Sequence, residues 1–252
     1  MGDSGETSVI ETFGLTKRYG QTSAVENLDM RLGPGEICAL LGPNGAGTTT
    51  TILMLLGLTG ISSGRARVLG FDPMDRPLEI KRRVGYLPEN VGFYNDLTAA
   101  ENLRFVAGLN GLSGPEAEWA IEESLLAVGL GEVSGKKAAA FSRGMRQRLG
   151  LAEVLVKKPE IMILDEPTLG LDPDGIDDIL ALIASLAQER NLSVLISSHL
   201  LPLVERVAHR ALILKRGRAV ASGRLDELAE AASLRGGLSE VYRHYFHQEG
   251  VV

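Results

Sequence analysis

The apolar and polar positions of the first forty residues follow the spacing of β-strands. Residues 9–13 and 28–32 alternate between apolar and polar side chains, as half-buried antiparallel strands do. Residues 36–41 form an apolar run typical of a strand buried on both faces. A glycine-rich loop follows, and residues 49–56 then predict a helix that ends at Gly57.

Helical spacing dominates the middle third of the chain. Thr98 and Ser113 each precede a glutamate by three residues, the pattern of a capping box, and Pro115 adds a favoured first-turn residue. A third helix is expected to start near Ser142 and to bury the apolar residues at 149, 152 and 156.

The last third returns to alternating strands and helices. Residues 161–164 and 194–196 predict short buried strands, and residues 176–187 between them predict one amphipathic helix. A hairpin is expected at 216–218, and a charged helical tail begins at Leu225. The whole pattern indicates an α/β sheet interrupted by a helical insertion.

Composition and charge narrow the class of protein. The 252 residues carry 26 Lys+Arg against 32 Asp+Glu, a net charge of −6, which argues against a polyelectrolyte partner such as a nucleic acid. The single cysteine, Cys38, cannot form an internal disulfide, which suits a reducing compartment. No apolar run reaches membrane-helix length, and the acidic N-terminus does not resemble a signal peptide. We therefore expect a cytosolic protein that a partner would bring to a membrane.

The glycine-rich loop carries a phosphate-binding pattern. It follows a buried strand and opens a helix, so its backbone N–H groups and the helix dipole would attract an anion. Plain tight turns of this composition also occur, and the loop alone leaves that alternative open. The hydroxyl of Thr49 stands at the position that binds Mg²⁺ in such loops. The pattern comprises Gly42, Pro43, Asn44, Gly45, Ala46, Gly47, Thr48 and Thr49.

Thr48 departs from this pattern, because a lysine that reaches the β- and γ-phosphates is expected there. The absence of this lysine removes a charge-assisted hydrogen bond worth about 1.5–3 kcal/mol. That corresponds to roughly 10- to 150-fold weaker binding. Since the charge matters more in the transition state, catalysis should suffer more than affinity.

Two carboxylates follow the buried strand at 161–164. Asp165 would hold Mg²⁺ through water, and Glu166 would polarise an attacking water. An acidic pair at a strand end is a weak signal by itself, but the sequence Pro-Thr-Leu-Gly-Leu-Asp that follows strengthens it.

Over residues 9–227 the chain resembles the ATP-binding cassette family, the nucleotide-binding subunits of membrane transporters, with the motifs in family order. The resemblance implies that Tyr19 stacks on adenine and that Thr50 and Asp172 also lie at the nucleotide. Glu89 matches a position where the family usually has Gln, and it implies an oxygen near Mg²⁺ and the attacking water. His199 matches the switch histidine that contacts the γ-phosphate.

The segment from Phe141 to Leu149 is similar to the family signature in the form found with exporter-type permeases. This implies that Ser142, Gly144 and Met145 face a nucleotide held by a second subunit. His209, His244 and His247 match no motif and are assigned to surface or packing positions.

The resemblance also implies a fold: a P-loop NTPase core with an N-terminal antiparallel β-subdomain and an inserted helical subdomain. The nucleotide-binding domain would span 7–228, with the core at 7–88 and 159–228 and the helical subdomain at about 90–158. Residues 229–252 would form a C-terminal helical tail.

Its ligands would be ATP and Mg²⁺, and its partners a second nucleotide-binding subunit and an integral-membrane permease, with no nucleic acid. The protein would then be cytoplasmic and peripheral on the inner face of the cell membrane.

Two functions remain open from the sequence. In the first, the chain is a transport-coupled ATPase. In the second, it is a degenerate or regulatory subunit that binds ATP without efficient hydrolysis. Thr48 favours the second, whereas Glu166 and His199 favour the first, because a subunit freed from hydrolysis would be expected to lose them. A cassette protein acting on DNA or ribosomes fits poorly, since 252 residues leave no room for a second cassette.

Overall fold

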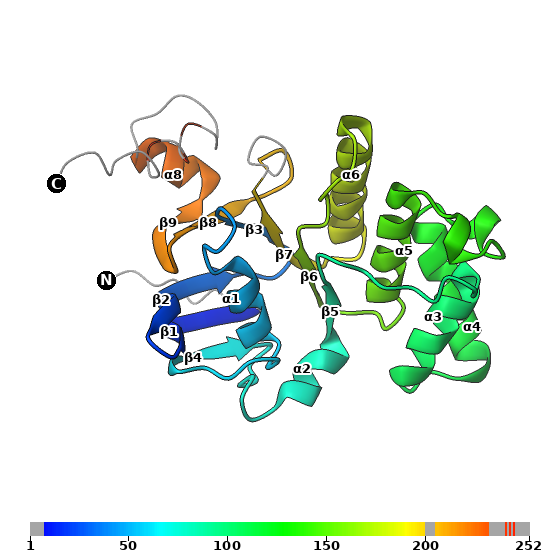
Figure 1. The fold of residues 1–252 in the computed structure, drawn as a ribbon, viewed down its shortest axis with the longest axis horizontal. Coiled ribbons are helices and arrows are strands. Elements are labelled where there is room, and N and C mark those ends of the chain that lie inside the picture. The colour runs from blue at the N-terminus through cyan, green and yellow to red at the C-terminus, as the bar shows by residue number, and fades with distance from the viewer. Residues whose placement is uncertain (1–7, 200–204, 232–239, 241, 243, 245–252) are drawn as a thin grey trace.

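The structure, a computed structural model, describes residues 8–199, 205–231, 240, 242 and 244. Its first part is a three-stranded antiparallel sheet in the order β2-β1-β4 (Figure 1). The strands are β1 (Ile10–Tyr19), β2 (Thr22–Leu32) and β4 (Ser63–Val68). Burial alternates strictly over residues 28–32, which confirms the expected half-buried strand. Strand β4 was not predicted, because only Ala66 and Val68 are apolar and buried in it.

A six-stranded sheet in the order β5-β6-β7-β3-β8-β9 forms the centre. Its first five strands run parallel and β9 runs antiparallel. Because β6, β7 and β3 are neighbours, the loops after their carboxyl ends meet at one edge of the sheet. The strands are β3 (Ile37–Leu41), β5 (Val84–Leu87), β6 (Ile161–Asp165), β7 (Ser193–Ser198), β8 (Arg210–Lys215) and β9 (Arg218–Arg224).

The central strands divide their side chains between two hydrophobic clusters. In β6, Ile161 and Ile163 pack with β1, β2 and helix α1 (Thr48–Leu55), whereas Met162 and Leu164 pack with helix α6 (Pro173–Glu189) and the helical part. This split follows from the two-residue period of a strand covered on both faces. Cys38 lies in the first cluster, and burial raises the pKa of its thiol to about 12.

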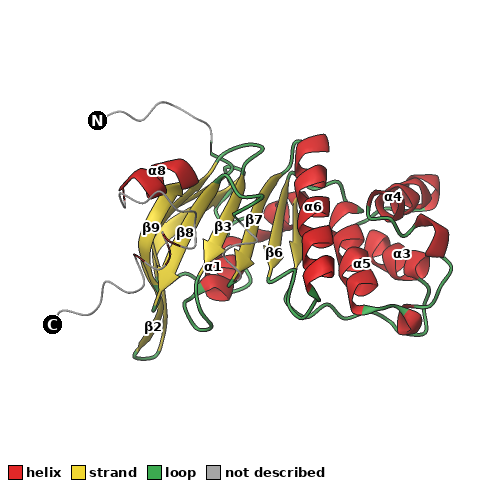
Figure 2. Cartoon of the chain, turned by 90° about the horizontal axis from the view of Figure 1, so that it is seen from above, coloured by secondary structure: helices red, strands yellow, loops and turns green. Residues whose placement is uncertain are grey.

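A group of helices lies on one side of the molecule, away from β1, β2 and β4 in Figure 1 and away from β2 in Figure 2. It comprises α3 (Ala99–Leu109), α4 (Gly114–Ala127), α5 (Arg143–Leu155) and two 3₁₀ turns at Gly131–Val133 and Ala138–Ala140. The expected buried residues at 149, 152 and 156 are confirmed.

The capping box at Thr98 is confirmed and the one at Ser113 is wrong. The Thr98 hydroxyl accepts from the Glu101 N–H, and the Glu101 carboxylate accepts from the Thr98 N–H. Ser113 is the N-cap of α4, but its side chain accepts no capping hydrogen bond. Gly114 follows with φ 60°, which is not the helical backbone that the first turn of a capping box requires.

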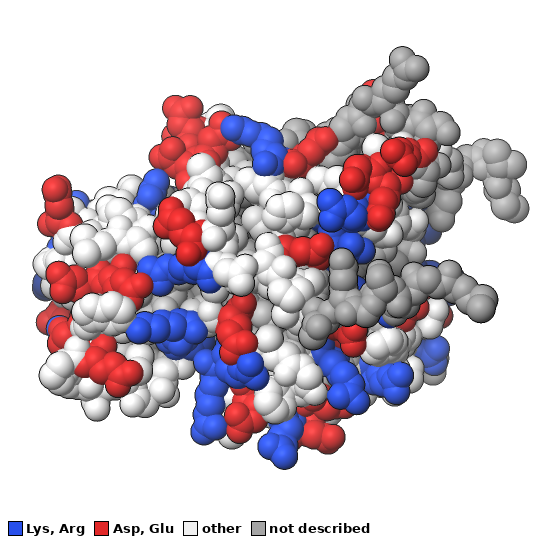
Figure 3. Space-filling model, turned by 180° about the vertical axis from the view of Figure 1, so that it is seen from behind, with Lys and Arg blue, Asp and Glu red and all other residues white. Residues whose placement is uncertain are grey.

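The remaining elements are short. Helix α2 (Pro77–Arg83) precedes β5 and was not predicted, whereas the hairpin between β8 and β9 and the helix α8 (Leu225–Ala231) were expected. Most of the predicted tail after α8 lies outside the described residues. Within the described residues, no helix is both long enough and apolar enough to cross a membrane. Acidic and basic side chains are interspersed over the face drawn in Figure 3, with no broad area of one sign.

Candidate active site

The phosphate-binding pattern forms a tight loop between β3 and α1. Gly47 ends it as the N-cap of α1 with φ 105°, and a Cβ there would lie 2.5 Å from the Ala24 carbonyl oxygen. Only glycine fits this position. The first bond of the helical ladder runs from the Thr51 N–H to the Gly47 carbonyl, at 2.9 Å. The N–H groups of residues 48–50 therefore have no carbonyl in a preceding helical turn and are available to an anion.

Thr48 occupies the first position of α1 and is partly buried. Pro43, Asn44 and Gly45 are exposed on the loop before it, and residues 42–50 include no Lys or Arg. The loop thus keeps its backbone donors and the helix dipole, but it contributes no side-chain cation.

The two carboxylates lie at the same edge of the sheet as the loop. Asp165 is buried at the end of β6, and its Oδ1 atom accepts from the Thr49 hydroxyl at 3.4 Å. The Ser197 hydroxyl donates to the same Oδ1 atom at 2.6 Å and accepts from the Glu166 N–H at 2.8 Å. Ser197 thus fixes both acidic residues. It was not singled out from the sequence, although it pairs directly with Asp165 across β6 and β7.

Glu166 and His199 form a direct contact. Nδ1 of His199 lies 2.9 Å from Oε2 of Glu166. Burial raises the pKa of the Glu166 carboxyl, and the hydrogen bond from His199 opposes that rise. Glu166 also has a positive φ of 49°, which is an uncommon conformation for a non-glycine residue and is found most often at functional sites. A partly desolvated carboxyl with an imidazole partner is suited to proton transfer.

Glu89 is exposed beyond β5, on the same side as these groups. Burial, followed by the negative charges of Asp165 and Glu89, raises the pKa of the Tyr86 hydroxyl to about 12. Glu89 likewise raises the pKa of Glu166, after the larger effect of burial. The charge of Glu89 therefore acts on the same edge of the sheet as those of Asp165 and Glu166.

The donor set suits a hard cation. Among the described residues, no three His, Cys, Asp or Glu side chains gather as a complete metal cluster. The Thr49 hydroxyl and the Asp165 carboxylate nevertheless lie 3.4 Å apart, and Glu89 is nearby. Mg²⁺ is commonly held by one or two carboxylates together with water and substrate phosphates, so these residues fit it.

Tyr19 ends β1 and is 52% exposed. Its hydroxyl lies 3.5 Å from the Thr59 hydroxyl, and Nζ of Lys17 lies 4.7 Å from the ring centroid. The ring therefore has a fixed position and an exposed surface on which a base could stack.

The remaining predicted residues lie at two helix starts. Ser142 caps α5 by accepting from the Met145 N–H at 3.2 Å, and Asp172 caps α6 by accepting from the Gly175 N–H at 3.2 Å. A Cβ at Gly144 would meet open space. Helix α5 lies apart from α1 in both ribbon views (Figures 1 and 2), so the structure does not bring Ser142, Gly144 and Met145 to the phosphate loop of the same chain.

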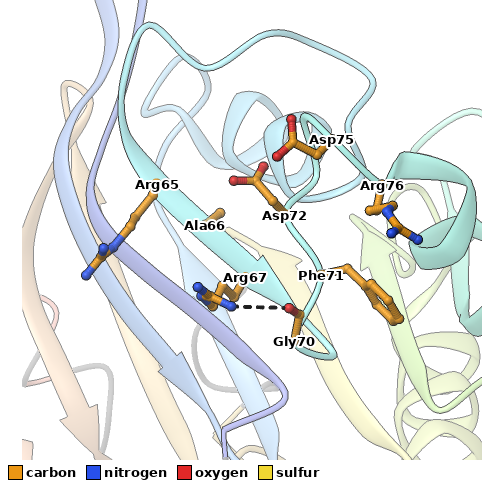
Figure 4. Close-up of a pocket in the computed structure, with 8 residues that line it drawn as sticks. All are labelled: Arg65, Ala66, Arg67, Gly70, Phe71, Asp72, Asp75 and Arg76. Carbon is orange, nitrogen blue, oxygen red and sulfur yellow. Dashed lines mark hydrogen bonds between the residues drawn. The ribbon is translucent and has the colours of Figure 1, made fainter.

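A hollow of about 420 Å³ beside β4 and α2 is separate from this constellation (Figure 4). Arg65 lies over the Phe13 ring, and Arg67 donates to the Gly70 carbonyl at 3.4 Å. Asp72 and Asp75 supply negative charge to the same lining, which includes none of the predicted site residues.

A phosphate loop at the carboxyl edge of a parallel sheet, with Asp165, Glu166 and His199 beside it, defines a nucleotide-binding protein of the P-loop class. The family model described as "ABC transporter" matches residues 25–169. The chain belongs to the ABC transporter family.

Individual relatives agree with this assignment. The bacitracin transport ATP-binding protein BcrA of Bacillus licheniformis is 40% identical, with 98% of this chain and 84% of that protein covered. The daunorubicin/doxorubicin resistance ATP-binding protein DrrA of Streptomyces peucetius is 36% identical over 88% of this chain and 67% of that protein. A solved ATP-binding subunit of an ABC transporter is 32% identical, with a TM-score of 0.84, covering 95% of this chain and all of that one. The predicted family and fold class are thereby confirmed.

Proposed function

We propose that this protein is the ATP-binding subunit of an exporter, and that it couples ATP binding and hydrolysis to transport by a separate permease. The observation that carries the proposal is the meeting of the phosphate loop with Asp165, Glu166 and His199 at one sheet edge. Similarity to BcrA and DrrA, whose names describe bacitracin transport and drug resistance, supports export.

Within the subunit, the N–H groups at the start of α1 bind the phosphates and Tyr19 stacks on the base. Thr49, Asp165 and Glu89 hold Mg²⁺, which neutralises phosphate charge when bound. Glu166 orients and polarises the attacking water, and His199 holds the Glu166 carboxylate and faces the γ-phosphate.

A second subunit completes the site. Ser142 is exposed at the start of α5, Gly144 and Met145 are partly buried in its first turn, and a Cβ at Gly144 would meet open space. Two subunits arranged head to tail would place each α5 start, with the positive end of its helix dipole, against the nucleotide of the other. The nucleotide-binding domain at 7–228 would then work at the inner face of the cell membrane, where the permease holds it.

The alternative function is a regulatory subunit that closes on ATP without turnover. Thr48 favours it, because the loop has no side-chain cation for the transition state. The intact contact between Glu166 and His199 favours the transport ATPase.

Equilibrium titration with a fluorescent ATP analogue in the presence of Mg²⁺ tests the proposal. We expect saturable binding that unlabelled ATP reverses and that Gly47→Val abolishes, since a side chain at Gly47 would collide with Ala24. Gly108→Ala, an exposed glycine of α3 with open space around it, is the matched control and should bind normally. Absence of saturable binding by a folded wild-type chain would contradict the proposal.

A further inference from the structure

The turn between β8 and β9 is fixed directly onto the phosphate loop. The Gly217 N–H donates to the Ala46 carbonyl at 2.9 Å, and the Gly217 carbonyl accepts from the Glu26 N–H at 2.7 Å. Gly217 has φ 81°, and a Cβ there would lie 2.7 Å from the Ala24 carbonyl oxygen. This two-residue turn therefore has one defined position, against the loop that binds phosphate.

The other residue of the turn, Arg216, is an unusual choice. Its φ is 48°, and two-residue hairpin turns with two positive φ values favour Asn or Gly at this position. An arginine here is conformationally strained, and strain of this kind concentrates at functional sites. Nothing in the packing requires it, because Arg216 is exposed.

The side chain of Arg216 is also available for a ligand. Its neighbour Arg218 forms an ion pair with Glu26, at 3.0 Å. Over residues 8–199 and 205–231, by contrast, no ion pair or hydrogen bond engages the Arg216 guanidinium. Lys17, at the Tyr19 end of the region, is already bonded to the Gly60 carbonyl at 2.6 Å.

The phosphate loop lacks a positive side chain because Thr48 stands where a lysine is expected, and Arg216 lies beside this loop. We propose that the Arg216 guanidinium binds the phosphates of the nucleotide at the rim of the phosphate loop, partly replacing the missing lysine. The planar guanidinium suits a phosphate because it can donate two parallel hydrogen bonds. This inference rests on the proposed function, since it requires that ATP occupies the loop.

The test compares Arg216→Asn with wild type by titrating Mg-ATP and adenosine. Asparagine removes the charge but tolerates the positive φ, so the turn should keep its fold. We expect ATP binding to weaken about tenfold, the lower end of the range for a lost charge-assisted hydrogen bond. Adenosine, which has no phosphate, should bind unchanged. Arg82→Asn makes the same charge change on α2 and should leave ATP affinity unaltered.

A double-mutant comparison sharpens the result. With Thr48→Lys in place, the loss caused by Arg216→Asn should shrink, because the lysine then neutralises the phosphates. Equal ATP binding by wild type and Arg216→Asn would overturn this inference and leave the proposed function standing. Parallel losses of ATP and adenosine would also overturn it, since they would indicate a distorted turn. A wild-type chain that binds no ATP would remove the proposed function itself.

Discussion

Nδ1 of His199 lies 2.9 Å from Oε2 of Glu166, and the two residues follow neighbouring strands of the central sheet. The pairing of β6 with β7 brings them together, and the Ser197 hydroxyl holds the Glu166 backbone at the same edge. The imidazole therefore acts directly on the carboxyl that would polarise water.

This contact predicts a pH effect. Burial raises the pKa of Glu166 and the His199 hydrogen bond lowers it, so removing the imidazole should raise that pKa further. In a hydrolysing background such as Thr48→Lys, His199→Ala should move the acidic limb of the kcat profile to higher pH. His199→Gln, which can still donate to Glu166, should move it less. An acidic limb that moves to lower pH would contradict the assignment.

Tyr19 provides a second prediction. Tyr19→Ala should weaken ATP and GTP binding alike, by roughly 1–3 kcal/mol, because any purine presents a face for stacking. Tyr94→Ala is the matched control, since Tyr94 is similarly exposed but packs edge-on against Phe105. Titration of both nucleotides measures the effect, and unchanged affinity in Tyr19→Ala would mean that another group holds the base.

A third prediction concerns assembly. Ser142→Arg should abolish ATP-dependent dimerisation, because it places a long side chain at the start of α5 where the second nucleotide would dock. Ser113→Arg alters the N-cap of α4 instead and should dimerise as wild type does. Light scattering with and without Mg-ATP, with circular dichroism to check folding, distinguishes them. A nucleotide-independent dimer that survives Ser142→Arg would refute the composite site.

A fourth prediction concerns Glu153, a residue outside the site, and the pH dependence of the stability of the folded chain. Burial raises its pKa to about 7, from an ordinary value of 4.5. Between these values the folded chain keeps a proton that the unfolded chain releases, so stability falls as pH rises through this window. Glu153→Gln should thus gain about 1–3 kcal/mol over wild type at pH 8 relative to pH 4.5. Urea unfolding at both pH values measures this, with the exposed Glu122→Gln as a control that should show no such gain.

Much of the fold could be predicted from local pattern. Strand β3, residues 161–164 of β6 and residues 194–196 of β7 are apolar runs, and α6 presents one apolar stripe, so these elements follow directly from the sequence pattern. Strand β4 and helix α2 could not, because their many basic side chains obscure the few buried apolar positions, such as Val68 and Ile80, that attach them to the core. The capping box predicted at Ser113 is wrong because the capping pattern takes no account of the backbone conformation of the glycine and proline that follow.

The candidate site divides in the same way. The phosphate loop and the acidic pair each consist of consecutive residues, so both can be recognised from the sequence. The bridging role of Ser197 depends on the register between β6 and β7. The position of Arg216 depends on a turn that is hydrogen-bonded to Ala46, which lies far away in the sequence. Such contacts arise only from tertiary pairing, so no local pattern could have indicated them.

The central claim is that this site is a competent ATPase whose turnover is limited by Thr48. Steady-state phosphate release by Thr48→Lys, at saturating Mg-ATP and with its permease or as an ATP-closed dimer, tests it most directly. Because the lysine acts mainly on transition-state charge, turnover should rise by orders of magnitude while ATP affinity rises about 10- to 100-fold. Thr48→Lys combined with Glu166→Gln should bind ATP and remain inactive. Background phosphate release by Thr48→Lys despite saturating Mg-ATP would contradict the claim and favour the regulatory subunit.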